Sequence, residues 1–520
     1  MRAVKCVLAA CVVLVAKKMV RMTAEKWAVC LIVLLACLPA TAQTHMGIDT
    51  SEFQRRRQSA INAAPEGIIL LHSLSGPKGW NESGFQQDCN FFYLTGLENL
   101  HNAILALDGT TKETWLFVMP PTEVQQRRFR LSALNGWDSV YLTPDHPTEQ
   151  ALGIDHIVAW DGFSDFIETR RKADPGIVLY SDQGLEGKMV ADVSNPPGLE
   201  PIENPYLLWP AALKAKWPDA NIADATPILQ RLRAVKSPAE IALMKKAAGS
   251  TDSGFRAAVA AIAPGRTNRQ IEGAAIEGAF RDGADGISMW PELKTGPVSS
   301  RTVFQKFYDY HLLNRTVQAG ETVLMDLGFN YQYYKGDVGR TLPVSGHFTQ
   351  EQREVIDLMN SAYQSGLQAL HDGVSADEVI RTCTRYVEDH RQGLHSELAR
   401  RAALELLKTN KWVMYTHGLE MVEIYPVKDL HTGNTVAFGP DFDVDGQGFY
   451  EEDVVLITAD GYQLINPPLP YSAADIEKMM AAEKQKHMAA PTGSQSMTGG
   501  STVDVRAEKG PQRTARLSVR

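Results

Sequence analysis

The chain has 520 residues, of which 44% are hydrophobic, 22% charged and 8% aromatic, a composition typical of folded proteins. This length predicts two or three domains and excludes disorder of the whole chain. The formal net charge of −9 excludes a general affinity for nucleic acid or for anionic membranes, since both require a basic surface.

Two apolar runs, residues 6–16 and 27–38, indicate that the first 42 residues are a leader. Each run is too short to span a bilayer, and the second ends in Pro39-Ala40-Thr41-Ala42, where small residues two apart are typical of a cleavage site. We expect a signal peptide over residues 1–42, with an over-extended start, and a secreted or periplasmic mature protein. An uncleaved hairpin or anchor is the alternative.

Residues 43–225 alternate short apolar runs with polar, helix-like segments. This alternation predicts an α/β domain with a largely buried sheet. The pattern turns polar and basic between Asp224 and Lys236, where we place the domain boundary. The apolar runs are 67–71, 103–107, 115–119 and 177–180.

Residues 226–483 carry the same arrangement twice. Two helices, each opened by a capping signal, are followed by strand-like segments at 322–328 and 338–344, and again at 435–438 and 454–458. We infer one domain made of two related halves. Residues 484–520 are rich in Gly, Ser and Thr and predict a disordered tail. The capping signals are Ser237 with Glu240, Thr267 with Gln270, Thr349 with Gln352, and Ser375 with Glu378.

Asp326 lies inside an apolar strand, and Asp337 follows eleven residues later. A hairpin centred between Tyr331 and Gln332 would place the two carboxylates opposite each other, and crowded like charges call for a cation. The alternative is one solvent-facing Asp and one turn Asp. The acidic run 451–453 precedes an apolar strand, so a further carboxylate can join the pair.

Three segments in order resemble aminopeptidase P, the Xaa-Pro aminopeptidase of the pita-bread metallopeptidases. Residues 319–349, AGETVLMDLGFNYQYYKGDVGRTLPVSGHFT, resemble its first metal-binding stretch. LRAVKSPAEIALMKKAA is similar to its domain junction, and FQQDCNFFYLTGLE to a motif of its amino-terminal domain. The resemblance implies an α+β fold, in which a creatinase-like amino-terminal α/β domain precedes a pita-bread domain with two related halves.

The resemblance also implies a metal site. Family members hold two divalent ions, commonly manganese, with two Asp, one His and two Glu. Carried over, the aspartates are Asp326 and Asp337, and the last glutamate is Glu451 in FYEEDVVLIT. An all-oxygen set of this kind suits Mn, Mg or Ca better than zinc. We expect at most one such ion per chain.

The other family positions are substituted. HGLEMVEIYPVKD places Met421 at the metal histidine and Lys428 at a second histidine, and Gly439 stands at the remaining glutamate. Phe449 replaces an arginine two residues before the last glutamate, and His311 is out of register with a further histidine. The dedicated ligands of one metal are therefore missing.

We expect an exported homologue that releases the residue preceding a penultimate proline, with activity impaired by the missing ligands. The alternative is a non-enzymatic protein that binds a peptide or protein on the pita-bread scaffold. Metal-free hydrolysis as in creatinase is disfavoured because its catalytic histidine is missing. The catalytic residues stay unassigned. His417 is the one candidate, but a lone histidine at such a position is more often structural. The expected partners are a peptide or protein ligand and a second copy in a homodimer, not nucleic acid or, after signal cleavage, a membrane.

Overall fold

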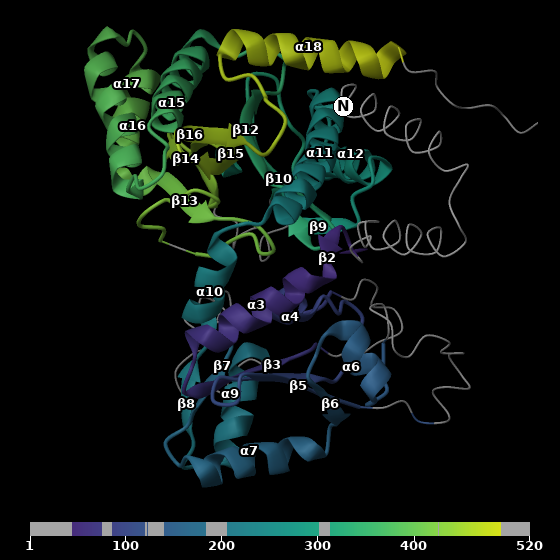
Figure 1. Ribbon diagram of the computed structural model, residues 1–520. Coiled ribbons are helices and arrows are strands. Elements are labelled where there is room, and N and C mark those ends of the chain that lie inside the picture. Colours follow the sequence, from purple (N-terminus) through teal and green to yellow (C-terminus); the bar gives the residue numbers. More distant parts are fainter. Residues whose placement is uncertain are drawn as a thin grey trace, which may run out of the picture.

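The computed structural model describes residues 44–74, 86–119, 122, 140–183, 205–300, 313–424 and 426–489. The expected leader and His311 lie outside these residues. Figure 1 shows two bodies joined through α10 (Thr226–Ala234), with the earlier part of the chain in the lower one. No helix in the described ranges combines the length and the apolarity that crossing a membrane requires.

The lower body is built on a six-stranded mixed sheet, as the alternating pattern predicts. Residues of the strand β3 (Gly67–His72) alternate between two hydrophobic clusters. Ile69 and Leu71 pack in one cluster, and Ile68 and Leu70 pack in the other. Both faces of the sheet are therefore covered by helices. In sheet order the strands are β6 (His156–Ala159), β5 (Glu113–Val118), β4 (Ile104–Asp108), β3 (Gly67–His72), β7 (Val178–Ser181) and β8 (Asn221–Asp224). The helices are α3 (Thr50–Ala63), α4 (Cys89–Thr95), α6 (His146–Leu152), α7 (Gly162–Ala173) and α9 (Pro205–Lys216), and a short ribbon β1 (Thr44–His45) and β2 (Ile48–Asp49) precedes them.

The upper body contains an eight-stranded antiparallel sheet. The strands β12 and β15 pair with each other and so join its two halves. The strands of the first half are β9 (Gly286–Thr295), β10 (Thr322–Tyr331), β11 (Tyr334–Lys335) and β12 (Val338–Pro343). Those of the second are β13 (Trp412–Thr416), β14 (Thr435–Val444), β15 (Gln447–Thr458) and β16 (Gly461–Leu464).

Two helix pairs pack on the upper sheet, one in each half, as the repeated capping signals predict. Ser237, Thr267 and Thr349 each form a reciprocal capping box, and Ser375 caps the fourth helix through its side chain alone. The pairs are α11 (Pro238–Ala261) with α12 (Asn268–Arg281), and α15 (Gln350–Gln368) with α16 (Ala376–His390). The remaining helices are α17 (Glu397–Leu406), α18 (Ala473–Ala489) and the 3-10 turns η2 (Gly296–Val298), η3 (Arg391–Gly393) and η4 (Thr409–Lys411).

The α18 helix continues six residues beyond the predicted start of the tail. Glu483 lies 3.0 Å from Arg256 of α11, and this ion pair connects α18 to α11. Lys486, in the last turn of α18, lies 2.8 Å from the same carboxylate. A Gly- and Ser-rich composition begins only after Ala489.

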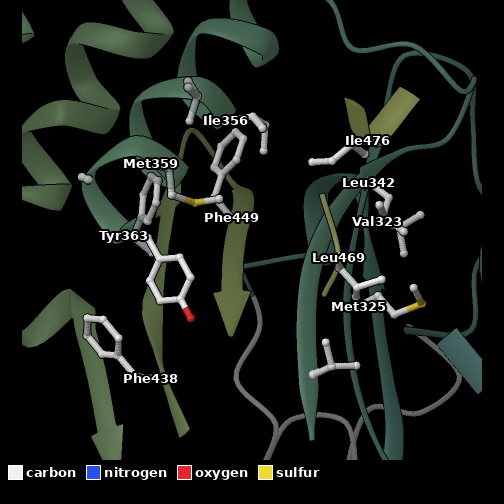
Figure 2. Close-up of a cluster of buried hydrophobic side chains, with 14 of the residues drawn as sticks. Val323, Met325, Leu342, Ile356, Met359, Tyr363, Phe438, Phe449, Leu469 and Ile476 are labelled. Carbon is white, nitrogen blue, oxygen red and sulfur yellow. The ribbon is translucent and has the colours of Figure 1, made fainter. Parts of the chain in front are cut away.

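The main core of the upper body lies between the sheet and its helices. Figure 2 shows Met359 and Tyr363 of α15 facing Phe438 of β14 and Phe449 of β15. Across the sheet, Val323 and Met325 of β10 belong to the same buried cluster. Because successive side chains of a strand point to opposite faces, the neighbours of these residues lie on the other face.

Candidate metal centre

Three carboxylates meet on the face of the upper sheet that points away from this core. One oxygen each from Asp326, Asp337 and Glu452 lies within 4.8 Å of the other two. Asp326 comes from β10, Asp337 directly precedes β12, and Glu452 comes from β15. The pairing of β12 with β15 therefore brings residues from both halves to one point.

Strand register explains this meeting. Asp326 stands opposite Gly339 of β12, and Gly339 stands opposite Glu452 of β15, so all three lie in one row across the sheet. Gly339 has no side chain to separate the two acids. A Cβ atom there would lie 2.0 Å from the ring of Tyr450, which covers this point of the sheet.

The hairpin that carries the two aspartates is centred one residue later than we predicted. Asn330 pairs with Lys335 and Tyr331 with Tyr334, so the turn lies at Gln332 and Tyr333, both with positive φ. Asp337 is therefore displaced by two residues from the position opposite Asp326, yet the carboxylates still come together.

The assignment of Glu451 to the site is corrected to Glu452. The strand β15 begins at Gln447, so the acidic run lies within the strand and its side chains alternate between faces. Glu451 points to the core face, where its carboxylate lies 2.7 Å from the guanidinium of Arg340. The residue two before the last glutamate is then Tyr450, and Phe449 belongs to the core.

Several carboxylate oxygens of the cluster are buried without a hydrogen-bond donor in the part of the chain that the structure describes. Oδ1 of Asp326, Oδ1 of Asp337 and both carboxylate oxygens of Glu452 are buried and lack a hydrogen-bond partner among the described residues. Burial, and then the charge of a neighbouring acid, raises the pKa of each of these carboxyls well above its ordinary value. Three crowded carboxylates are stable in their ionised form only if a positive charge joins them.

These residues fit one hard divalent cation. They offer only oxygen donors, which suits Mn, Mg or Ca. Tyr415 of β13 orients the site, because its hydroxyl donates a 3.0 Å hydrogen bond to Oδ2 of Asp337. Burial raises the pKa of Tyr415 well above 10, so the hydroxyl keeps its proton.

Three residues stand where the sequence resemblance leads us to expect a glutamate and two histidines: Gly439, Lys428 and Met421. Gly439 lies on the cluster face beside Glu452, but a Cβ atom there would lie 1.6 Å from the carbonyl oxygen of Glu451. Lys428 is exposed, and its carbonyl accepts a hydrogen bond from the backbone N–H of Ala376. The side chain of Met421 offers only a thioether, a soft ligand.

His417 is held by backbone carbonyls. Its Nδ1 lies 3.0 Å from the carbonyl of Met421, and its Nε2 lies 2.9 Å from that of Lys335. Burial lowers the pKa of His417, although the two carbonyls act in the opposite direction. We therefore assign His417 a structural role, in which it fixes the segment that carries Met421.

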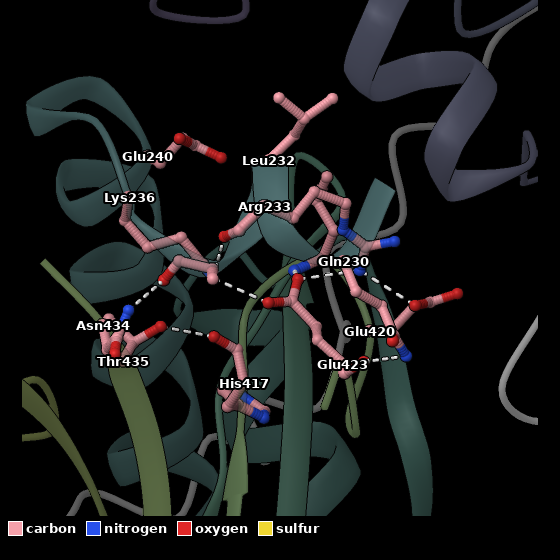
Figure 3. Close-up of polar contacts among 12 residues, drawn as sticks. Gln230, Leu232, Arg233, Lys236, Glu240, His417, Glu420, Glu423, Asn434 and Thr435 are labelled. Atoms are coloured by element: carbon pink, nitrogen blue, oxygen red, sulfur yellow. Dashed lines mark hydrogen bonds and ion pairs between the residues drawn. The ribbon is translucent and has the colours of Figure 1, made fainter. Parts of the chain in front are cut away.

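A buried ion network anchors the same segment to the domain junction. Figure 3 shows Glu423 between Lys236 and Arg233, with carboxylate distances of 2.6 and 2.8 Å. Glu420 also pairs with Arg233, at 2.9 Å. Burial alone would raise the pKa of Glu423, but the two cations outweigh it and lower the pKa to about 2.

Sequence reasoning missed the charged residues that β9 adds to this face. Glu292 stands directly opposite Asp326, and Lys294 lies two residues further along β9. The sequence of β9 contains Pro291 and mixes polar with apolar residues, so its pattern does not predict a strand. The alternation of charged Glu292 and Lys294 around apolar Leu293 is typical of a strand and could have indicated β9.

The chain resembles known proteins over most of its length. Residues 242–459 match the metallopeptidase family M24, and residues 53–177 match the aminopeptidase P N-terminal domain. The Xaa-Pro aminopeptidase of Escherichia coli K12 is 28% identical over 346 residues, which cover 65% of this chain and 72% of the relative. That of Haemophilus influenzae is 25% identical over 459 residues, which cover 82% and 97%.

Solved structures share the fold. Escherichia coli aminopeptidase P, zinc-substituted and in complex with product, superposes with a TM-score of 0.64 at 22% identity, covering 84% of this chain and 99% of the other. The same enzyme with the inhibitor Pro-Leu gives a TM-score of 0.64 at 23% identity with the same coverage.

Proposed function

The chain belongs to the aminopeptidase P family of M24 metallopeptidases, and on this premise we propose that it is an exported one-metal homologue with weak Xaa-Pro aminopeptidase activity. The observation that carries the proposal is the asymmetry of the site. Asp326, Asp337 and Glu452 converge with buried, unpartnered oxygens, whereas Met421 and Gly439 provide neither imidazole nor carboxylate.

The residues of the chain have distinct roles in this proposal. Asp326, Asp337 and Glu452 hold one divalent cation, and Tyr415 fixes the orientation of Asp337. When bound, such an ion supplies Lewis-acid polarisation of a substrate carbonyl. His417 is bound to backbone carbonyls and is not available to stabilise charge on the substrate. Loss of one such stabilising contact typically costs roughly 100- to 1000-fold in rate.

The test combines a peptide assay with metal analysis of the purified mature chain. We expect hydrolysis of Xaa-Pro peptides that is at least about 100-fold slower than that of a two-metal relative, and that is lost in Asp337→Ala. Asp377→Ala, on the exposed first turn of α16, is the matched control and keeps the activity. Turnover equal to that of a relative would contradict the proposal.

A second candidate is a peptide- or protein-binding protein without catalysis. The buried network around Glu423 favours it, because this network fixes the Met421 segment in a non-ligating arrangement. Binding of a Xaa-Pro peptide by the wild type and by Asp337→Ala with equal affinity, without turnover by either, would select this candidate.

A further inference from the structure

A buried cation lies on the same face of the sheet as the three carboxylates. Lys294 is only 7% exposed, and its Nζ contacts a carboxylate oxygen of Glu292. Glu292 faces Asp326 across the β9–β10 pair, and Lys294 faces Leu324 two residues away. Residues directly opposite each other in an antiparallel pair share a face. The ammonium of Lys294 is therefore placed beside the metal centre by strand register.

The charge of Lys294 acts on several acids of this face. Glu292 stands directly opposite Asp326, so the ion pair between Lys294 and Glu292 lies next to the carboxylate cluster. On β14, Asp441 stands opposite Tyr450 on the cluster face. Burial raises the pKa of Asp441, and the positive charge of Lys294 acts against this rise. A buried ammonium is costly unless acids surround it. Here Glu292 is in direct contact with the ammonium, and Asp326 stands opposite Glu292 on the next strand.

We propose that Lys294 takes the electrostatic place of a second metal ion and thereby restricts the site to one divalent cation. The side chain neutralises Glu292, which would otherwise offer another carboxylate beside Asp326, and its charge opposes a second cation on the same face. This inference rests on the proposed function, because it explains how the chain stays folded around an incomplete two-metal site.

The test measures Mn²⁺ binding by titration calorimetry and native mass spectrometry. For Lys294→Met we expect Mn²⁺ to bind at least about tenfold tighter than to the wild type, because a nearby positive charge is removed and Glu292 is released. Lys294→Arg keeps the charge and is expected to keep the wild-type affinity. If Lys294→Met is too unstable to purify, Lys294→Gln takes its place, since its amide can still donate to Glu292.

Two further variants decide the cause. Lys411→Met is the matched control: Lys411 also acts on Asp441, but it lies 4.0 Å from Glu405 and is 25% exposed. We expect its affinity for Mn²⁺ to change less than about threefold. In the double variant Lys294→Met with Glu292→Gln, most of the gain should disappear, because the released carboxylate is absent.

The outcomes separate this inference from the proposed function. Equal affinities in the wild type, Lys294→Met and Lys411→Met would overturn the inference and leave a one-metal site in place. A wild type that binds two ions tightly would overturn both. A wild type that binds none, beside a Lys294→Met variant that binds one, would also overturn both, because Lys294 would then exclude the first ion and not a second one.

Discussion

Glu451 and Glu452 are adjacent in the sequence, but their side chains lie on opposite faces of the sheet. Each is 1% exposed, but Glu451 pairs with Arg340 on the core face, whereas Glu452 faces the two aspartates. The pleat of β15 is the cause, because consecutive side chains leave a strand on opposite sides. A motif alignment that is displaced by one residue therefore exchanges a structural acid for a metal ligand.

The close approach of β14 and β15 at Gly439 gives a prediction about stability. A Cβ atom at this position would lie 1.6 Å from a backbone oxygen, which cannot move without separating the strands. We expect Gly439→Ala to lower the free energy of unfolding by about 3 kcal/mol or to prevent folding. Gly439→Glu will therefore not rebuild the missing ligand.

Thermal and urea unfolding measure this effect. The control is Gly249→Ala on α11, where a Cβ meets nothing within 4 Å and the helix gains an alanine. Gly249→Ala should be neutral or stabilising. Equal stability of Gly439→Ala and the wild type would show that the two strands lie further apart.

At the scale of elements, the segment 417–424 is fixed to the domain junction by Glu423. The pKa of this carboxyl is lowered to about 2 from an ordinary value of 4.5, despite burial, by Lys236 and Arg233. A carboxyl with a depressed pKa in the folded state stabilises the fold fully above its unfolded pKa and loses this contribution as pH falls toward 2.

The corresponding prediction concerns Glu423→Gln. At pH 7 this variant should unfold with a free energy lower by about 3 kcal/mol, because two buried cations lose their partner. The difference from the wild type should shrink between pH 4.5 and pH 2, as measured by urea unfolding at several pH values. Glu397→Gln, which removes an exposed partner of Arg400, should differ by less than about 1 kcal/mol. A pH-independent difference for Glu423→Gln would contradict the account.

Elements that depend on local signals were predictable, and those that depend on register were not. The capping boxes at Ser237, Thr267 and Thr349 fixed the helix starts, because a cap involves only four neighbouring residues. The site required the pairing of β12 with β15, which joins residues more than 100 positions apart. The position of Lys294 beside the cluster depends on the pairing of β9 with β10, so no local pattern reveals it.

At the scale of the whole molecule, the site lies where the two halves of the upper sheet meet. Asp326 and Asp337 come from the first half and Glu452 from the second, with Gly339 of β12 between Asp326 and Glu452. Under the proposed one-metal site, the first half supplies two ligands and the second half supplies one, although each half contributes strands to the same sheet.

The expected leader gives a prediction about the mature chain. Because the second apolar run ends in small residues at Ala40 and Ala42, the protein from its native host should begin near Gln43. Mass spectrometry of the intact chain measures this mass directly. Recovery of only the full-length chain from the cytoplasm would contradict export.

The central proposal is that Asp326, Asp337 and Glu452 hold one metal ion and that the chain holds no second one. The most direct measurement is native mass spectrometry of the chain equilibrated with Mn²⁺, for the wild type, Glu452→Gln and Glu451→Gln. We predict one ion for the wild type, none for Glu452→Gln and one for Glu451→Gln, with thermal unfolding as a check that each variant is folded. Two ions on the wild type, or loss of the ion in Glu451→Gln but not in Glu452→Gln, would contradict it.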